Sequence, residues 1–110
     1  MHLRDINEFS AFIKPEFSAF NKTEATRIAI VKFGLPSCPP CKIVGEKLLK
    51  LRQKYPHNIT LGEINLAEGD NAEVFNIHKA PVVHVYYGGK LIVTTNANIE
   101  ALENEIAKLL

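Results

Sequence analysis

Short apolar stretches along the chain predict four strands. Residues 27–33 are rich in β-branched side chains and almost continuously apolar, which indicates a mostly buried strand. A second strand is predicted over 59–66. Residues 82–87 and 91–95 flank the glycine pair 88–89, and this pattern is typical of a hairpin with a two-residue turn.

Apolar residues at helical spacing predict helices between and after these strands. The longest helix is predicted from Pro39 to about Tyr55, with Pro56 ending it. A short helix is expected over 71–77, and an amphipathic helix from Ile99 to Leu109 completes the chain. The apolar stripe of the longest helix consists of Val44, Leu48, Leu51 and Tyr55.

A further helix is predicted near the N-terminus. Asp5 and Glu8 have the spacing of a capping box, and apolar residues follow at helical spacing until Pro15 interrupts them. A second short helical turn is expected to carry Phe17 and Phe20. The predicted order of elements is therefore helix, strand, helix, strand, helix, hairpin and helix.

This order predicts an α/β fold. Strands separated by helices pair in parallel through right-handed crossovers, whereas the closing hairpin adds antiparallel strands to the same sheet. We therefore expect a central mixed β-sheet with helices on both faces. The chain has 110 residues, 46% of them hydrophobic, which is enough for one modest core, and we expect residues 1–110 to form a single domain.

Charge and the N-terminal sequence exclude several classes of function. With 13 Lys and Arg against 12 Asp and Glu, the net charge is +1. No long-range electrostatic field therefore draws the protein to nucleic acid or to a membrane surface. Charged residues interrupt the first twenty positions every few residues, so these lack the apolar run of a signal peptide or membrane span. We expect a soluble, monomeric, cytoplasmic protein.

The two cysteines, Cys38 and Cys41, are the main candidates for chemistry. A disulfide that closes only a four-residue loop removes little chain entropy, so a purely structural staple is disfavoured. Zinc would need two further ligands. His78 and His84 are six residues apart, outside the spacing that suits a zinc finger helix, so we expect no metal and no cofactor.

A redox role explains more features of this pair. Thiol–disulfide exchange needs an exposed thiolate that attacks and a nearby thiol that resolves the mixed disulfide. Cys38 is expected at the start of a helix, where the helix dipole favours a thiolate, and Cys41 about one turn inside. Pro39 suits the first helical position and Pro40 stiffens the same turn. Cys38 is therefore the predicted nucleophile and Cys41 the resolving thiol.

From Ile28 to Leu110 the chain resembles the thioredoxin family. The resemblance rests on Cys-x-x-Cys-Lys after a buried strand and on a proline that begins a strand some forty residues later. It implies the thioredoxin fold and a thiol–disulfide oxidoreductase. It also implies that Pro81 is a cis-proline, which turns the Ala80 backbone toward the cysteines to pair with an incoming peptide.

Several residues depart from the family pattern. Ser37 stands where a tryptophan is usual, and 96–98 replaces a frequent glycine beside the substrate groove. Lys32 occupies the place of a buried aspartate, and Glu63 that of its partner lysine. Either the two form an ion pair beneath the active site, with Glu63 as the proton acceptor for Cys41, or Lys32 extends to the surface and Glu63 is solvated.

The leading interpretation is a reductant of protein disulfides that acts in cell redox homeostasis and is regenerated by a reductase of unknown identity. A glutaredoxin-like activity competes with it, although the residues after Pro81 lack the Gly-Asp pair with which glutaredoxins hold glutathione. A disulfide oxidase or isomerase is also compatible with the cysteine pair. A non-catalytic thioredoxin-like binding module is a further alternative, although the intact pair Cys38 and Cys41 at a helix start disfavours it. The reduction potential of that pair would separate a reductant from an oxidant.

Overall fold

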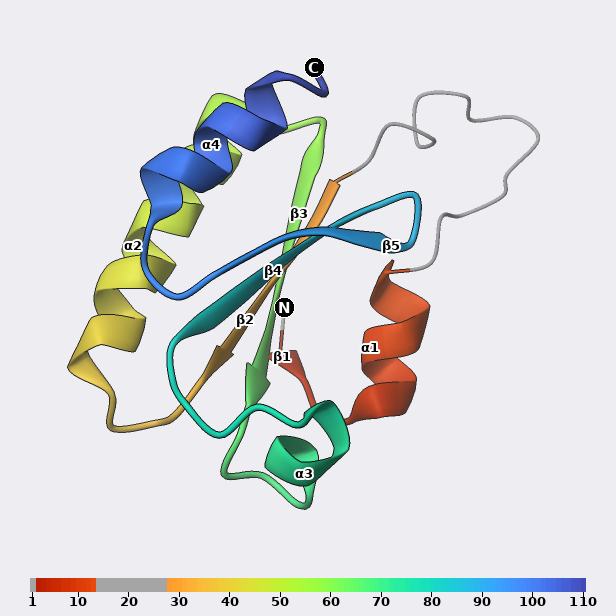
Figure 1. Ribbon diagram of the computed structural model, residues 1–110, viewed down its shortest axis with the longest axis vertical. Helices are drawn as coiled ribbons and strands as arrows, with labels where there is room; N and C mark the ends of the chain where they lie inside the picture. The colour runs from red at the N-terminus through yellow and green to blue at the C-terminus, as the bar shows by residue number, and fades with distance from the viewer. Residues whose placement is uncertain (1, 14–27) are drawn as a thin grey trace.

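A five-stranded sheet organises residues 2–13 and 28–110, which are the part of the chain that the computed structural model describes (Figure 1). The order of its strands is β1-β3-β2-β4-β5. The strands are β1 (His2–Leu3), β2 (Ile28–Gly34), β3 (Ile59–Asn65), β4 (Val82–Tyr87) and β5 (Lys90–Thr95). The helices are α1 (Ile6–Ile13), α2 (Pro39–Lys54), α3 (Asn71–Phe75) and α4 (Ile99–Ala107).

The sheet is mixed, as the sequence predicts. β2 lies in the middle, parallel to β3 and antiparallel to β4, while β1 pairs in parallel with β3 and β5 forms the hairpin with β4. Gly88 and Gly89 adopt φ values of 61° and 81° in the hairpin turn, a conformation that glycine takes without steric cost. The sequence did not predict β1, and the expected turn with Phe17 and Phe20 lies outside the described residues.

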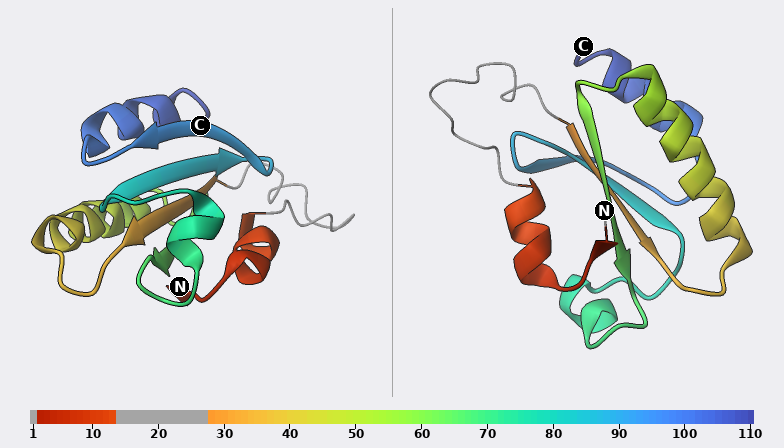
Figure 2. Two further views of the ribbon diagram at one scale, coloured as in Figure 1. Left: turned by 60° about the horizontal axis from the view of Figure 1, so that its bottom comes forward. Right: turned by 180° about the vertical axis from the view of Figure 1, so that it is seen from behind.

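Helices cover both faces of the sheet (Figure 2). Alternation along β2 sends Ile28 and Ile30 to the face packed by α2 and α4, whereas Val31 and Phe33 point to the face packed by α1 and α3. The α2 side includes the predicted stripe of that helix, in which Val44, Leu48 and Leu51 are buried. Two apolar cores, one on each side of the sheet, therefore hold the central strand in place.

The start of α1 has half of the predicted capping box. The Asp5 carboxylate accepts hydrogen bonds from the amides of Asn7 and Glu8, each at 3.0 Å. The Glu8 carboxylate accepts a hydrogen bond from Nε of Arg4 at 2.6 Å, so this contact replaces the expected return bond to the Asp5 amide. Phe9 anchors the helix by packing edge-on against Phe75, with 4.9 Å between ring centroids.

Among the described residues, Asn71 is the one buried polar residue, and 2% of its surface is exposed. Its side-chain amide donates to the carbonyl of Arg4 at 2.9 Å and to the carbonyl of Asn65 at 3.1 Å. These bonds join the segment before α1, the end of β3 and the start of α3. Asn71 therefore fixes three segments of the chain to one another by hydrogen bonds, next to the apolar core that includes Leu3 and Leu66.

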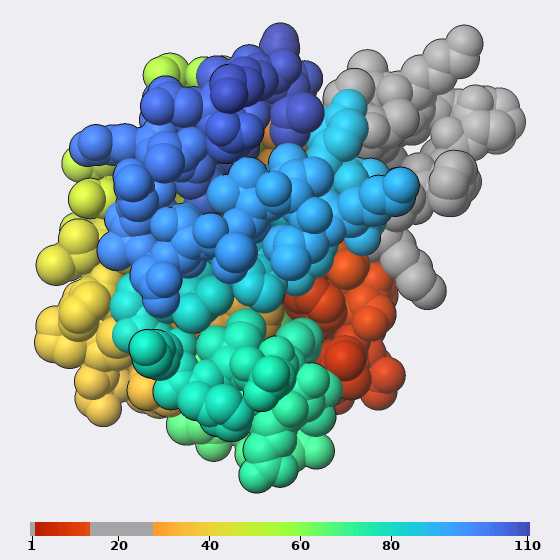
Figure 3. Space-filling model, in the orientation of Figure 1, coloured from red at the N-terminus to blue at the C-terminus, as the bar shows by residue number. Residues whose placement is uncertain are grey.

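The surface of the described chain is mixed in polarity. Figure 3 shows the side on which β5 and α4 face the viewer. β5 is the outer strand of the hairpin, and its Leu91 and Ile92 are 50% and 42% exposed. None of the helices described here is long and apolar enough to cross a membrane.

Candidate active site

The two cysteines lie where the central strand passes into the first long helix. β2 ends at Gly34, a short exposed loop follows, and Cys38 is the N-cap residue of α2. Cys38 and Cys41 are joined by a disulfide, with 5.2 Å between their Cα atoms. The extended backbone of Cys38 and the helical position of Cys41 place both sulfurs in the first turn of α2.

The prolines between the cysteines decide which amide reaches the outer sulfur. Pro39 and Pro40 occupy the first two helical positions and have no N–H group. The first N–H group of the helix is therefore that of Cys41, and it is shared between the Cys38 carbonyl at 3.1 Å and the Cys38 sulfur at 3.2 Å. Cys38 is 9% exposed and Cys41 3%, so the sulfur that receives this hydrogen bond is also the more accessible one.

Pro81 lies at the same end of the sheet. Val82 is paired with Phe33, near the end of β2, and the peptide bond between Ala80 and Pro81 is cis, as expected. The Asn96 side chain donates to the Pro81 carbonyl at 3.3 Å. Asn96 thus supports the proline segment from the end of β5, a contact for which the sequence gives no local signal.

The segment 96–98, which contains Asn96, also caps a helix. The Asn98 side chain accepts a hydrogen bond from the amide of Ala101 at 3.1 Å, which caps the start of α4. The loop that replaces the family's usual glycine is therefore held at both ends. Ser37, which replaces the usual tryptophan, is exposed and leaves the first turn of α2 without an aromatic neighbour at that position.

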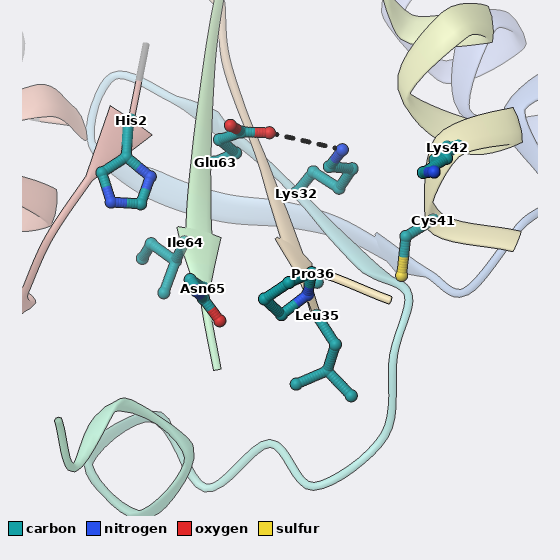
Figure 4. A pocket seen from close by; sticks show the side chains of 10 residues that line it. His2, Lys32, Leu35, Pro36, Cys41, Lys42, Glu63, Ile64 and Asn65 are labelled. Atoms are coloured by element: carbon teal, nitrogen blue, oxygen red, sulfur yellow. Dashed lines mark ion pairs between the residues drawn. The ribbon is translucent and has the colours of Figure 1, made fainter. Parts of the chain in front are cut away.

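Lys32 and Glu63 form an ion pair, with 3.3 Å between Lys32 Nζ and Glu63 Oε2 (Figure 4). They are paired residues of the parallel strands β2 and β3, which brings the two side chains together. The Lys32 side chain is 18% exposed and that of Glu63 52%. Of the two alternatives that the sequence left open, the ion pair forms, although only the lysine is largely buried and Glu63 stays half exposed.

A cavity of about 290 Å³ connects this ion pair with the inner cysteine. It opens between the ends of β2 and β3 and the first turn of α2 (Figure 4). Its lining consists of His2, Lys32, Gly34, Leu35, Pro36, Cys41, Lys42, Glu63, Ile64 and Asn65. The structure thus brings Lys32, Glu63 and Cys41 to one cavity.

The histidines considered as ligands are not part of this site. No group of three metal-ligating side chains occurs in the described ranges, and His78 is exposed. His84 packs edge-on against Phe33, with 4.9 Å between ring centroids, and its Nδ1 lies 2.8 Å from the Tyr86 hydroxyl. Burial lowers the pKa of His84 and raises the pKa of Tyr86 to about 12, which favours the neutral form of each.

A disulfide in the first turn of a helix, with a cis-proline at the same end of the sheet, has the arrangement of a thiol–disulfide oxidoreductase. Comparison with known families agrees, because the family profile described as Thioredoxin matches residues 11–108. The chain belongs to the thioredoxin family.

Individual relatives support this membership. A thioredoxin of Coprinus comatus is 32% identical over 95 residues, which cover 83% of this chain and 90% of that protein. A thioredoxin of Buchnera aphidicola from Schizaphis graminum is 27% identical over 81 residues, or 73% of this chain and 75% of that protein. Among solved structures, oxidised mitochondrial thioredoxin 3 of Saccharomyces cerevisiae is 26% identical and superposes with a TM-score of 0.76, covering 98% of this chain and 93% of that one.

Proposed function

We propose that this oxidoreductase reduces disulfide bonds of client proteins in the cytoplasm. In its dithiol form the Cys38 thiolate attacks one sulfur of the client disulfide, and the other client sulfur leaves as a thiolate. Cys41 then attacks Cys38 in the mixed disulfide, which releases the second client thiol and forms the Cys38–Cys41 disulfide. Two electrons pass from the cysteine pair to the client, and a reductase of unknown identity restores them.

The hydrogen bond at the start of α2 is the observation that carries this assignment of roles. An amide at a helix N-terminus stabilises negative charge on an acceptor, and one of the two acceptors of the Cys41 amide is the Cys38 sulfur, at 3.2 Å from the nitrogen. Cys38 is also more exposed than Cys41. Both features support Cys38 as the attacking thiol.

The client is proposed to lie along the segment that contains Ala80 and Pro81. An extended peptide can pair with exposed backbone next to the cysteines, which provides affinity with little dependence on sequence. The contact from Asn96 to the Pro81 carbonyl supports a fixed position for this segment. Because Ser37 is small and exposed, we expect bulky residues near the client disulfide to be tolerated.

Glu63 is the proposed acceptor for the proton that Cys41 loses when it resolves the mixed disulfide. Both residues line the same cavity, which has room for water between them. The half-exposed carboxylate can pass the proton on to solvent. Glu63→Gln should therefore slow resolution around neutral pH, and an unchanged rate of disulfide reduction would refute this role.

The activity can be tested by reduction of the disulfides of insulin, with dithiothreitol as the source of electrons. We expect turnover for the unmodified protein and none for Cys38→Ser. After dithiothreitol has been removed, reduced Cys41→Ser mixed with insulin should accumulate a mixed disulfide with the client, visible by mass spectrometry. Turnover that survives in Cys38→Ser would refute the assignment.

The same protein preparations separate the competing functions. Turnover that requires glutathione would indicate a glutaredoxin-like activity, and a reduction potential well above that of the cytosolic glutathione pool would indicate an oxidase or isomerase. The absence of turnover under every one of these conditions would indicate a binding module. We expect a monomer, which sedimentation at the assay concentration checks.

A further inference from the structure

The Lys32 side chain lies in a slot between β2 and α2 that two glycines leave open. A Cβ atom on Gly34 would lie 3.8 Å from Lys32 Cε and 3.4 Å from Cys41 Sγ. A Cβ atom on Gly45 would lie 3.0 Å from Lys32 Nζ. The stem of the lysine therefore passes Gly34 next to the inner sulfur, and its ammonium lies close to α2 at Gly45.

The Lys32 ammonium in this slot is better shielded from water than the Glu63 carboxylate with which it pairs. Only 18% of the Lys32 side chain is exposed, against 52% for Glu63, so solvent screens the carboxylate more than the ammonium. Three further ionisable side chains face the region: His2 from β1, and Lys42 and Glu46 from α2. His2 is paired with Glu68 at 3.2 Å, and Lys42 and Glu46 are exposed.

We propose that Lys32 is a positioning residue that stabilises the thiolate of Cys41 through its charge, and that the missing side chain of Gly45 lets the ammonium lie between β2 and α2. This proposal rests on the redox function described above, and it adds the residues that set the balance between disulfide and dithiol. Lys32 does not take part in bond formation. It acts on the charge that develops on the inner sulfur.

The charge of Lys32 should shift the equilibrium between disulfide and dithiol in one direction, toward the dithiol. In equilibrium with glutathione, two glutathione thiols are oxidised to one glutathione disulfide while the Cys38–Cys41 bond is reduced to two thiols. A nearby cation stabilises the reduced form, because only this form carries thiolate charge. Removal of the cation therefore favours the protein disulfide and makes the protein a stronger reductant.

Lys32→Met tests the charge while nearly preserving the length of the side chain. We expect the equilibrium constant against glutathione to shift about tenfold toward the protein disulfide at a pH above the alkylation midpoint of Cys41 in both proteins, because the inner sulfur carries the charge that Lys32 stabilises only when it is ionised. A tenfold shift corresponds to a reduction potential about 30 mV lower. In a Cys38→Ser background, the pH midpoint for alkylation of Cys41 by iodoacetamide should rise by about one unit.

Lys47→Met is the matched control, since it removes the same charge from the helix that bears the cysteines. Lys47 is exposed and lines a different cavity, between α2 and α4, together with Glu100 and Glu103. We expect this variant to change the glutathione equilibrium less than about twofold. Equal shifts in the two variants would overturn the proposal, because the position of the charge would then be irrelevant.

Gly45→Ala tests the slot without removing any charge. The added methyl group would push the ammonium toward Glu63 and solvent, so the equilibrium should shift about twofold to threefold in the same direction as in Lys32→Met. Alanine also favours the helix, so the variant should be at least as stable as the unmodified protein toward urea. An unchanged equilibrium in Gly45→Ala would overturn the role of the slot.

The glutathione equilibrium needs no client protein. If the protein fails to reduce insulin but Lys32→Met still shifts the equilibrium, the proposed function fails and the role of Lys32 stands. If insulin is reduced and the equilibrium is the same in Lys32→Met as in the unmodified protein, the role of Lys32 fails and the function stands. The two outcomes are therefore distinguishable.

Discussion

Replacing Asn71 by alanine should destabilise the fold far more than expected for a polar residue at the start of a short helix. The change removes two hydrogen bonds, to the carbonyls of Arg4 and Asn65. Each bond contributes about 1 kcal/mol net, and both are only partly buried, so water can reach the carbonyls that are left behind. The expected loss in the free energy of unfolding is about 2–3 kcal/mol, a large part of the ~5–15 kcal/mol typical of a domain.

Urea unfolding followed by circular dichroism measures this loss. Asn104→Ala is a suitable control, because Asn104 is an exposed residue of α4 and its replacement should change stability by less than about 0.5 kcal/mol. Asn71→Asp keeps the size of the side chain and loses its donors, so it should be at least as unstable as Asn71→Ala at neutral pH. Acidification should restore part of the loss, because a protonated carboxyl donates once. A cost below about 1 kcal/mol for Asn71→Ala would refute the reasoning.

Three further predictions address other parts of the molecule. Because burial lowers the pKa of His84 in the folded protein, the free energy of unfolding should fall as the pH drops below 6.5, where the unfolded chain binds the proton more readily. His84→Phe should flatten this part of the plot of unfolding free energy against pH, and an unchanged plot would exclude the mechanism. Gly62→Ala should cost about 1–3 kcal/mol in urea unfolding, since its Cβ atom would lie 2.9 Å from Leu3 Cδ1 and 3.0 Å from the ring of Phe12; a neutral effect would show that both side chains shift freely. Asn96→Ala should lower kcat/KM for insulin about twofold to fivefold and leave the glutathione equilibrium unchanged, because it loosens Pro81 only; equal kcat/KM values would remove Asn96 from client binding.

The long periodic elements could be predicted from the sequence because their patterns are local. The apolar run of β2, the stripe of α2 and the glycine pair of the hairpin each contain enough positions to define a period or a turn. β1 could not be found in this way, because it has two residues and exists only through its pairing with β3. Helix and strand ends shifted by one or two residues at several places, as capping and pairing rather than periodicity decide them.

The residues of the site also differ in how far the sequence could predict them. The cysteine pair and the cis-proline carry short sequence signatures, so their places were predicted. Counting along the two strands gave the contact between Lys32 and Glu63 as one of two alternatives, because burial cannot be read from one sequence, and the greater burial of the lysine depends on the slot at Gly45. Asn71 had no signature, because one of its hydrogen-bond partners lies 67 residues away in the chain.

The hairpin turn offers a place to attach reporters. Tyr87, just before Gly88, pairs with Ile28 at the beginning of β2, whereas the cysteines follow the opposite end of that strand. Among residues 2–13 and 28–110, nothing lies within 4 Å of a Cβ atom built on Gly88. Turns of this kind tolerate insertions well. A fluorophore or affinity tag inserted between Gly88 and Gly89 would therefore allow covalent client complexes to be captured and counted without altering the surface on which they form.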